Sequence, residues 1–151
     1  MKRIIVFFAA LMVIGSIFAE EPKEKAKPIE LTKSSFLDKV FDYEESPDAW
    51  NYKGDKPAIV DFYANWCGPC RITSPVLAEL AAEYGDEIYI YKIDVDRETE
   101  LARLFGARSL PMFLFIPMEE DPRISVGAIP KKSFREVIDS FLLKKEKLTN
   151  L

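Results

Sequence analysis

The sequence predicts an α/β protein with a central mixed β-sheet and helices on both of its faces. Short apolar runs typical of strands alternate with segments that carry apolar residues at helical spacing. Their order is strand–helix, strand–helix–strand–helix, strand–strand–helix. The clearest strand, residues 58–63, leads into Cys67-Gly68-Pro69-Cys70, and a helical pattern follows. The chain's two cysteines therefore lie at a strand-to-helix junction.

The first 19 residues have the pattern of a secretory signal peptide. Lys2 and Arg3 precede an apolar run over residues 4–14, and a small residue, Ala19, stands before the charged segment that follows. We expect cleavage near Ala19 and export of the mature chain. The alternative is an uncleaved membrane anchor, although the apolar run is shorter than the ~20 residues that span a bilayer comfortably.

The mature chain has the composition of one folded domain with short flanking segments. Residues 20–28 are charged and contain proline, which predicts a flexible linker; the domain is expected over residues 29–147, with a tail of residues 148–151. Asp and Glu number 25 against 21 Lys and Arg, which argues against nucleic acid as the main partner. An exported protein whose only cysteines form a C-x-x-C pair does not use disulfides as a structural framework, so its thiols serve chemistry.

The first elements of the domain are a short strand and a capped helix. Residues 29–31 predict the strand, and Thr32 or Ser34 can cap a helix that buries Phe36, Val40 and Phe41. Residues 42–57 form a long connection with aromatic residues among charges. We expect these aromatic side chains to cover the core; the alternative is a docking feature for a partner.

The helix after the cysteines carries an apolar stripe that is expected to face the core. It is made of Ile72, Val76, Leu80 and Tyr84, with Leu77 and Ala81 beside them. Pro75 lies inside this helix and Gly85 ends it. A strand is predicted over residues 88–95. A short helix over residues 98–105 follows, with Leu101, Leu104 and Phe105 facing inward.

The last part of the chain predicts two strands and a helix. One strand begins at Pro111, since proline is tolerated at the start of a strand. An edge strand is expected over residues 123–128. The final helix has a core-facing stripe of Phe134, Val137, Ile138, Phe141 and Leu142.

The cysteine pair is placed for thiol–disulfide exchange. The attacking species in such exchange is a thiolate, which the free N–H groups and dipole of a helix N-terminus stabilise. Cys67 would stand at that end and Cys70 one turn along, on the same face. A structural disulfide is a weaker interpretation, because so short a loop removes little chain entropy. A zinc site needs four ligands, and the chain has no histidine and no third cysteine, so we expect no metal and no cofactor.

Asp61 is the second residue with a candidate chemical role. It stands in a strand whose other residues are all apolar or aromatic, so both faces of the strand are expected to be buried. A buried carboxyl group has a raised pKa and can carry the proton of a neighbouring thiol. The alternative is an Asp at a strand edge that reaches water.

Trp66-Cys67-Gly68-Pro69-Cys70 resembles the active-site pentapeptide of the thioredoxin family. Three further residues stand at positions that match the family's pattern: Asp61 six residues before the first cysteine, Lys92, which matches the lysine that pairs with that Asp, and Pro111, which matches the family's cis-proline. The resemblance covers nearly the whole mature chain and implies the thioredoxin fold. It also implies that Cys67 attacks a substrate disulfide, that Cys70 resolves the mixed disulfide and that Asp61 moves the proton. The residues expected to hold the substrate are Trp66, Gly68, Pro69, Leu110, Pro111, Val126 and Gly127.

Some positions depart from the family's pattern: Tyr63 stands where many thioredoxins have Trp, Asn65 replaces a commoner acidic residue, and Met112 follows Pro111 where Thr is frequent. The signal peptide and the segment 42–57 resemble exported thioredoxin-like proteins of Gram-negative bacteria. We therefore expect a monomeric periplasmic reductase of protein disulfides, which a membrane electron donor would regenerate. A periplasmic oxidase or isomerase on the same fold is the alternative, and a non-catalytic binding module is a third hypothesis.

Overall fold

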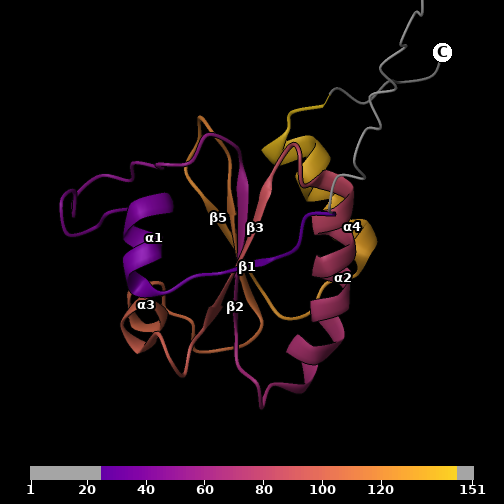
Figure 1. The fold of residues 1–151 in the computed structure, drawn as a ribbon, viewed down its shortest axis with the longest axis horizontal. Helices are drawn as coiled ribbons and strands as arrows, with labels where there is room; N and C mark the ends of the chain where they lie inside the picture. Colours follow the sequence, from indigo (N-terminus) through magenta and orange to yellow (C-terminus); the bar gives the residue numbers. More distant parts are fainter. Residues whose placement is uncertain (1–24, 146–151) are drawn as a thin grey trace, which may run out of the picture.

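The computed structural model describes residues 25–145 (Figure 1). The predicted signal peptide, most of the linker, residues 146 and 147, and the tail 148–151 lie outside the described residues. Five strands form one sheet in the order β1-β3-β2-β4-β5. Strands β1, β3 and β2 run parallel to one another, whereas β4 is antiparallel to β2 and β5 is antiparallel to β4. The predicted mixed sheet is therefore confirmed. The strands are β1 (Ile29–Glu30), β2 (Ala58–Tyr63), β3 (Tyr89–Asp94), β4 (Met112–Ile116) and β5 (Arg123–Val126).

Helices cover both faces of the sheet, as Figure 1 shows. One face is covered by α1 (Lys33–Lys39) and α3 (Thr99–Leu104), and the other by α2 (Gly68–Tyr84) and α4 (Lys131–Val137), which continues as the π-helical turn η1 (Ile138–Leu142). The predicted order of elements is confirmed throughout. Within residues 25–145, no helix combines the length and the apolar character needed to cross a membrane.

The core under α1 and α3 includes the aromatic residues of the long segment 42–57. Thr32 caps α1 as predicted, in a capping box with Ser35. The ring of Trp50 packs on Phe41 with centroids 4.6 Å apart, so the expectation that these aromatics cover the core is confirmed. The prediction that Leu104 faces inward was wrong: its side chain is 50% exposed because α3 is short and only Leu101 points fully into the core.

The core under α2 and α4 is built on aromatic contacts between the sheet and α4. Phe113 of β4 meets Phe134 of α4 edge to face, with ring centroids 5.0 Å apart. The face expected to be buried on α2 is confirmed at Leu77, Leu80 and Ala81, and Val76 and Tyr84 pack against its edge. The prediction was wrong at Ile72, which is 72% exposed. The residues that α2 buries are Cys70, Thr73, Leu77, Leu80 and Ala81.

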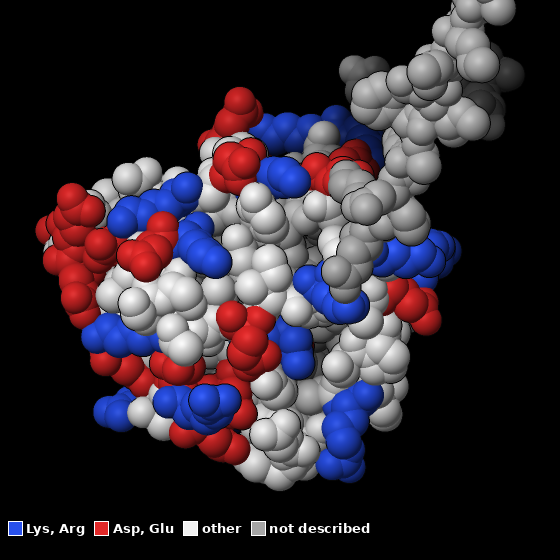
Figure 2. Space-filling view, in the orientation of Figure 1, with Lys and Arg blue, Asp and Glu red and all other residues white. Residues whose placement is uncertain are grey.

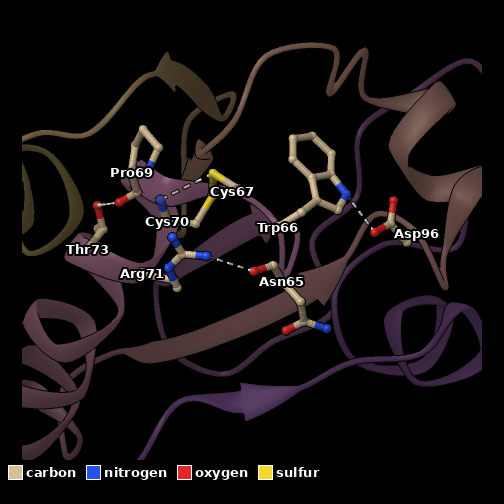
Figure 3. Close-up of a disulfide and its surroundings, with 8 residues drawn as sticks. All are labelled: Asn65, Trp66, Cys67, Pro69, Cys70, Arg71, Thr73 and Asp96. Atoms are coloured by element: carbon tan, nitrogen blue, oxygen red, sulfur yellow. Dashed lines mark hydrogen bonds between the residues drawn. A yellow bond between two sulfur atoms is a disulfide. The ribbon is translucent and has the colours of Figure 1, made fainter.

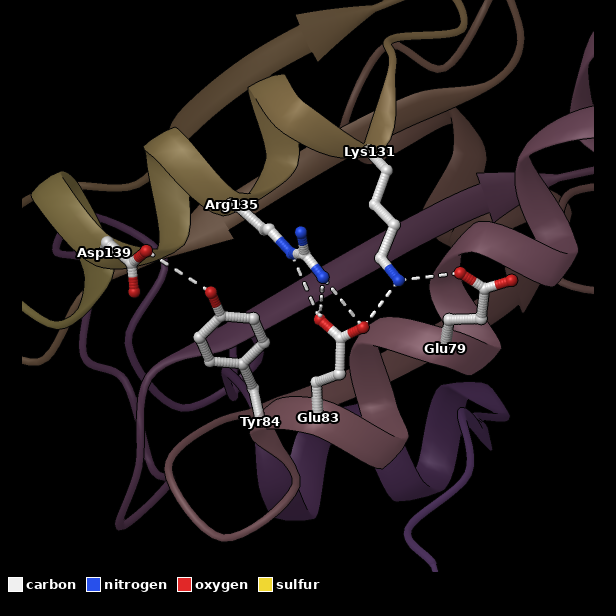
Figure 4. A network of polar contacts seen from close by, with 6 residues as sticks. All are labelled: Glu79, Glu83, Tyr84, Lys131, Arg135 and Asp139. Carbon is white, nitrogen blue, oxygen red and sulfur yellow. Dashed lines mark hydrogen bonds and ion pairs between the residues drawn. The ribbon is translucent and has the colours of Figure 1, made fainter.

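Charged side chains link α2 to α4 above this core (Figure 4). Glu83 accepts hydrogen bonds from Nε and Nη2 of Arg135 and also pairs with Lys131, which reaches Glu79 at 2.7 Å. These hydrogen bonds hold the pKa of Glu83 below its usual range. Elsewhere, acidic and basic side chains are interspersed over the face drawn in Figure 2. The network joins α4 to α2, and α2 carries the cysteines.

Candidate active site

The cysteine pair sits where the chain passes from β2 into α2. Cys67 is the N-cap residue of α2, and its sulfur accepts a hydrogen bond from the backbone N–H of Cys70, 3.2 Å away (Figure 3). Pro69 occupies the first turn, where its missing N–H leaves no bond unmade. A disulfide joins Cys67 to Cys70. The predicted position of Cys67 at a helix N-terminus is confirmed, and a thiolate there would meet the same N–H group and the positive end of the helix dipole.

An open pocket of about 330 Å³ reaches one of the two cysteines. Cys67 lines it, together with Trp66, Gly68, Pro69 and Leu110 among the predicted site residues, whereas Cys70 does not. The Trp66 side chain is 68% exposed, and its indole N–H donates to Asp96 at 2.8 Å, which fixes the ring beside the disulfide (Figure 3). A substrate that enters this pocket therefore meets Cys67 and not Cys70.

The turn before β4 contributes Leu110 to the lining of this pocket. The Leu110–Pro111 peptide bond is cis, as the resemblance implied. Leu110 packs against the cysteines, and neither of its backbone groups makes a hydrogen bond within the described part of the chain. The backbone of Pro111 accepts a hydrogen bond from Gly127 at 2.8 Å, and Val126, 56% exposed, pairs with Met112. Val126 and Gly127 adjoin Pro111 but do not line the pocket.

Asp61 is buried in the central strand of the sheet, as predicted. Its side chain is 2% exposed, and its Oδ1 atom has no hydrogen-bond partner. Burial raises the pKa of the Asp61 carboxyl to about 7; the positive charge of Lys92 opposes this rise, and Glu30 adds to it. The carboxyl group can therefore hold or release a proton near neutral pH.

Lys92 lies beside Asp61 in the sheet but does not form the expected ion pair with it. The two residues are register partners on β3 and β2. The Lys92 ammonium instead lies over the ring of Tyr63, 3.9 Å from its centroid. Tyr63, which departs from the family's pattern, explains why the ion pair is missing. Its ring offers the ammonium a cation–π contact, and its hydroxyl donates to the nearby Glu30 carboxylate.

Three residues that line the pocket were missed by the reasoning from sequence, namely Val95, Ala107 and Arg108. Asp96, which orients Trp66 without lining the pocket, was missed as well. The segment after β3 could have been found, because the carboxyl ends of the parallel strands β2 and β3 meet at one edge of the sheet. Arg108 carried no such signal, since it lies in the irregular turn after α3 and only the fold brings it to the cysteines.

Comparison with known proteins agrees with the geometry of the site. The family model described as Thioredoxin matches residues 29–140. The chain belongs to the thioredoxin family. A thioredoxin of Borreliella burgdorferi is 44% identical over 113 residues, which cover 75% of this chain and 96% of that protein.

More distant relatives share the family and the fold. A chloroplastic M-type thioredoxin of Pisum sativum is 39% identical over 88 residues, 58% of this chain and 51% of that one. Among solved structures, a mutant thioredoxin from Halobacterium salinarum superposes with a TM-score of 0.60 at 28% identity, and the match covers 77% of this chain and 91% of that one. The protein is a thioredoxin-family thiol–disulfide oxidoreductase.

Proposed function

We propose that this protein is an exported reductase of protein disulfides that works through the Cys67–Cys70 pair. The observation that carries the proposal is the asymmetry of the two cysteines. Cys67 caps α2 and lines the open pocket, whereas Cys70 lies one turn deeper and does not line it. Exchange needs this arrangement, because one sulfur must meet the substrate while the other waits within reach of the first.

In the proposed reaction the Cys67 thiolate attacks one sulfur of a substrate disulfide. A mixed disulfide forms, and the other substrate sulfur leaves as a thiolate that takes a proton from water. Cys70 then gives its proton to the Asp61 carboxylate, directly or through water, and attacks the Cys67 sulfur. The second substrate thiolate leaves, and the protein is left with the disulfide seen in the structure. Two electrons pass from the protein to the substrate.

The proposed substrate is an extended protein segment that lies against the turn before β4. The unpaired backbone groups of Leu110 support this role, because an added strand would satisfy them. Trp66, Gly68 and Pro69 would form one wall of the groove. Val126 and Gly127 would form the other, next to Pro111.

Export to the periplasm and a membrane electron donor complete the proposal. Export is supported by the charged start, apolar run and small residue of the first 19 residues. Each turnover leaves the protein oxidised, so a reductant must restore the two thiols. A membrane donor is proposed because an oxidising compartment does not supply soluble reductant readily.

The reduction potential of the Cys67–Cys70 pair tests the direction of the reaction. We expect a value near −250 mV or lower, because the Gly-Pro dipeptide between the cysteines is that of the reducing members of the family. The reduction potential of thioredoxin itself is about −270 mV. The measurement equilibrates the domain with glutathione and dithiothreitol buffers. A value above about −180 mV would overturn the reductase proposal and place the protein with isomerases and oxidases.

Trapping tests whether protein disulfides are the substrates. In Cys70→Ser the mixed disulfide on Cys67 has no resolving thiol, so we expect covalent complexes that reductant releases and mass spectrometry identifies. The matched control, Cys67→Ser, keeps one thiol in the motif but removes the sulfur that lines the pocket. Equal recovery from both variants, or none from Cys70→Ser, would contradict the proposed roles of the two cysteines.

A further inference from the structure

Three charged residues stand in a row across the parallel part of the sheet. Glu30 of β1 is the register partner of Lys92 of β3, and Lys92 is the register partner of Asp61 of β2. Register partners on parallel strands project to the same face of a sheet. The Lys92 ammonium therefore stands between two carboxyl groups, one buried and one at the exposed edge strand.

Tyr63 links the Glu30 carboxylate to the Lys92 ammonium. It follows Asp61 by two positions, so it lies on the same face of the strand. Its hydroxyl donates to Oε1 of Glu30 at 2.8 Å, and its ring lies under the Lys92 ammonium at 3.9 Å. The ammonium thus lies on the ring that Glu30 orients and makes no ion pair with Asp61, whose Oδ1 atom stays without a partner.

We propose that Glu30 is a positioning residue for proton transfer, which acts through Tyr63 and Lys92 to keep the Lys92 ammonium from pairing with Asp61. The inference rests on the proposed function of Asp61 as the proton carrier for Cys70. An ammonium paired with Asp61 would hold the carboxylate ionised, and a carboxylate so stabilised is a poor base. Glu30 touches neither the cysteines nor the substrate pocket.

Glu30 and Lys92 are the main charged groups around Asp61. The in-register residue of β4, Phe113, is uncharged, as is every residue that α2 buries. The remaining acid on this face is Asp94 of β3, whose carboxylate accepts hydrogen bonds from Asn65 and from the backbone of Asp96. Tyr63 carries no charge near neutral pH, because burial raises the pKa of its hydroxyl further above its usual value.

A double-mutant cycle on the oxidised protein tests the coupling. The pKa of Asp61 is read from its carboxyl carbon by NMR in wild type, Glu30→Gln, Lys92→Gln and the double variant; the disulfide removes the thiol titrations. We expect Glu30→Gln to lower the pKa of Asp61 by about 1 unit, since the released ammonium moves toward it. In the Lys92→Gln background the same change should have less than half of that effect.

Equal shifts in both backgrounds, or no shift from Glu30→Gln, would overturn the proposal, because Glu30 would then act directly or not at all. Should Lys92→Gln fail to fold, Tyr63→Leu replaces it in the cycle, since it removes the ring that holds the ammonium. Glu45→Gln is the matched control: it removes the same charge from the segment between α1 and β2, where Glu45 pairs with Lys53, and should leave Asp61 unchanged.

A kinetic readout separates failure of this inference from failure of the proposed function. Cys70 can pass its proton only to ionised Asp61, so the rate of the resolving step rises with pH through the pKa of Asp61. Glu30→Gln should move that rise to lower pH by the shift seen in the NMR titration. If Asp61→Asn leaves the rate and its pH dependence unchanged, the proton-carrier role fails, while the NMR cycle still reports whether Glu30 acts through Lys92.

Discussion

At the scale of single residues, the buried carboxyl group of Asp61 is the feature that links stability to activity. Its ordinary pKa of 3.8 rises to about 7 in the folded protein because of burial. The folded state therefore keeps a proton that the unfolded chain has already lost between about pH 4 and pH 7. Stability falls as pH rises through that window and levels off above it. A buried acid that lowers the stability of the fold near neutral pH is expected at a functional site rather than in a purely structural core.

Asp61→Asn should stabilise the oxidised protein, and increasingly so as pH rises. The asparagine cannot ionise, so the variant escapes the cost of a buried charge. We expect a gain of up to ~4 kcal/mol in the free energy of unfolding at pH 8, and little gain near pH 4. Urea unfolding across this pH range measures it. The control is Asp38→Asn on the exposed side of α1, which should change stability little at any pH. A gain from Asp61→Asn that did not vary with pH would contradict the assigned cause.

The residues that carry chemistry were accessible from sequence to different degrees. The two cysteines and Asp61 could be found, because a C-x-x-C after a strand and an acid in an apolar strand are local signals. The position of the Lys92 ammonium could not, because it depends on the choice among Asp61, Glu30 and the ring of Tyr63. That choice depends on strand register and side-chain rotamer, which no local pattern encodes.

At the scale of elements, α2 shows why the first turns of a correctly predicted helix can be assigned the wrong buried residue. The spacing of apolar residues favoured a stripe that begins at Ile72. Thr73 occupies the buried position instead, and its hydroxyl donates to the Pro69 carbonyl at 3.1 Å. A polar side chain that satisfies itself on its own helix can enter a core. When Thr73 is counted as a surface residue, its apolar neighbour Ile72 is taken for the buried one.

A pair of substitutions on α2 checks this assignment of its faces. Ile72→Ser should change the free energy of unfolding by less than about 0.5 kcal/mol, since the side chain is 72% exposed. Leu77→Ala should cost about 2–5 kcal/mol, since Leu77 is fully buried and leaves a cavity. Denaturant unfolding of both oxidised variants measures the difference. Costs of similar size would mean that α2 turns its other face to the sheet.

At the scale of the whole molecule, the chain brings together residues that are far apart in the sequence. The pocket joins the start of α2 to the segment after β3 and the turn before β4. Alternation of strand and helix patterns predicted the elements. The order of the strands in the sheet was not predicted, because local pattern does not say which strands pair. The interhelical ion pairs around Glu83 were not predicted either, since they depend on how α4 crosses α2.

Export is the prediction that concerns the whole chain, and it depends on residues outside the described part. We expect residues 1–28, fused to a reporter enzyme that is active only when its disulfides form outside the cytoplasm, to give an active reporter with Glu20 as its new first residue. A fusion of residues 20–28 should be inactive. So should the first fusion with Leu11→Arg, which places a charge inside the apolar run. An active but uncleaved product in the membrane fraction would show that this segment is a membrane anchor and not a cleaved signal peptide. An inactive product from residues 1–28 would contradict export, and the protein would then draw its electrons from the soluble reductants of the cytoplasm.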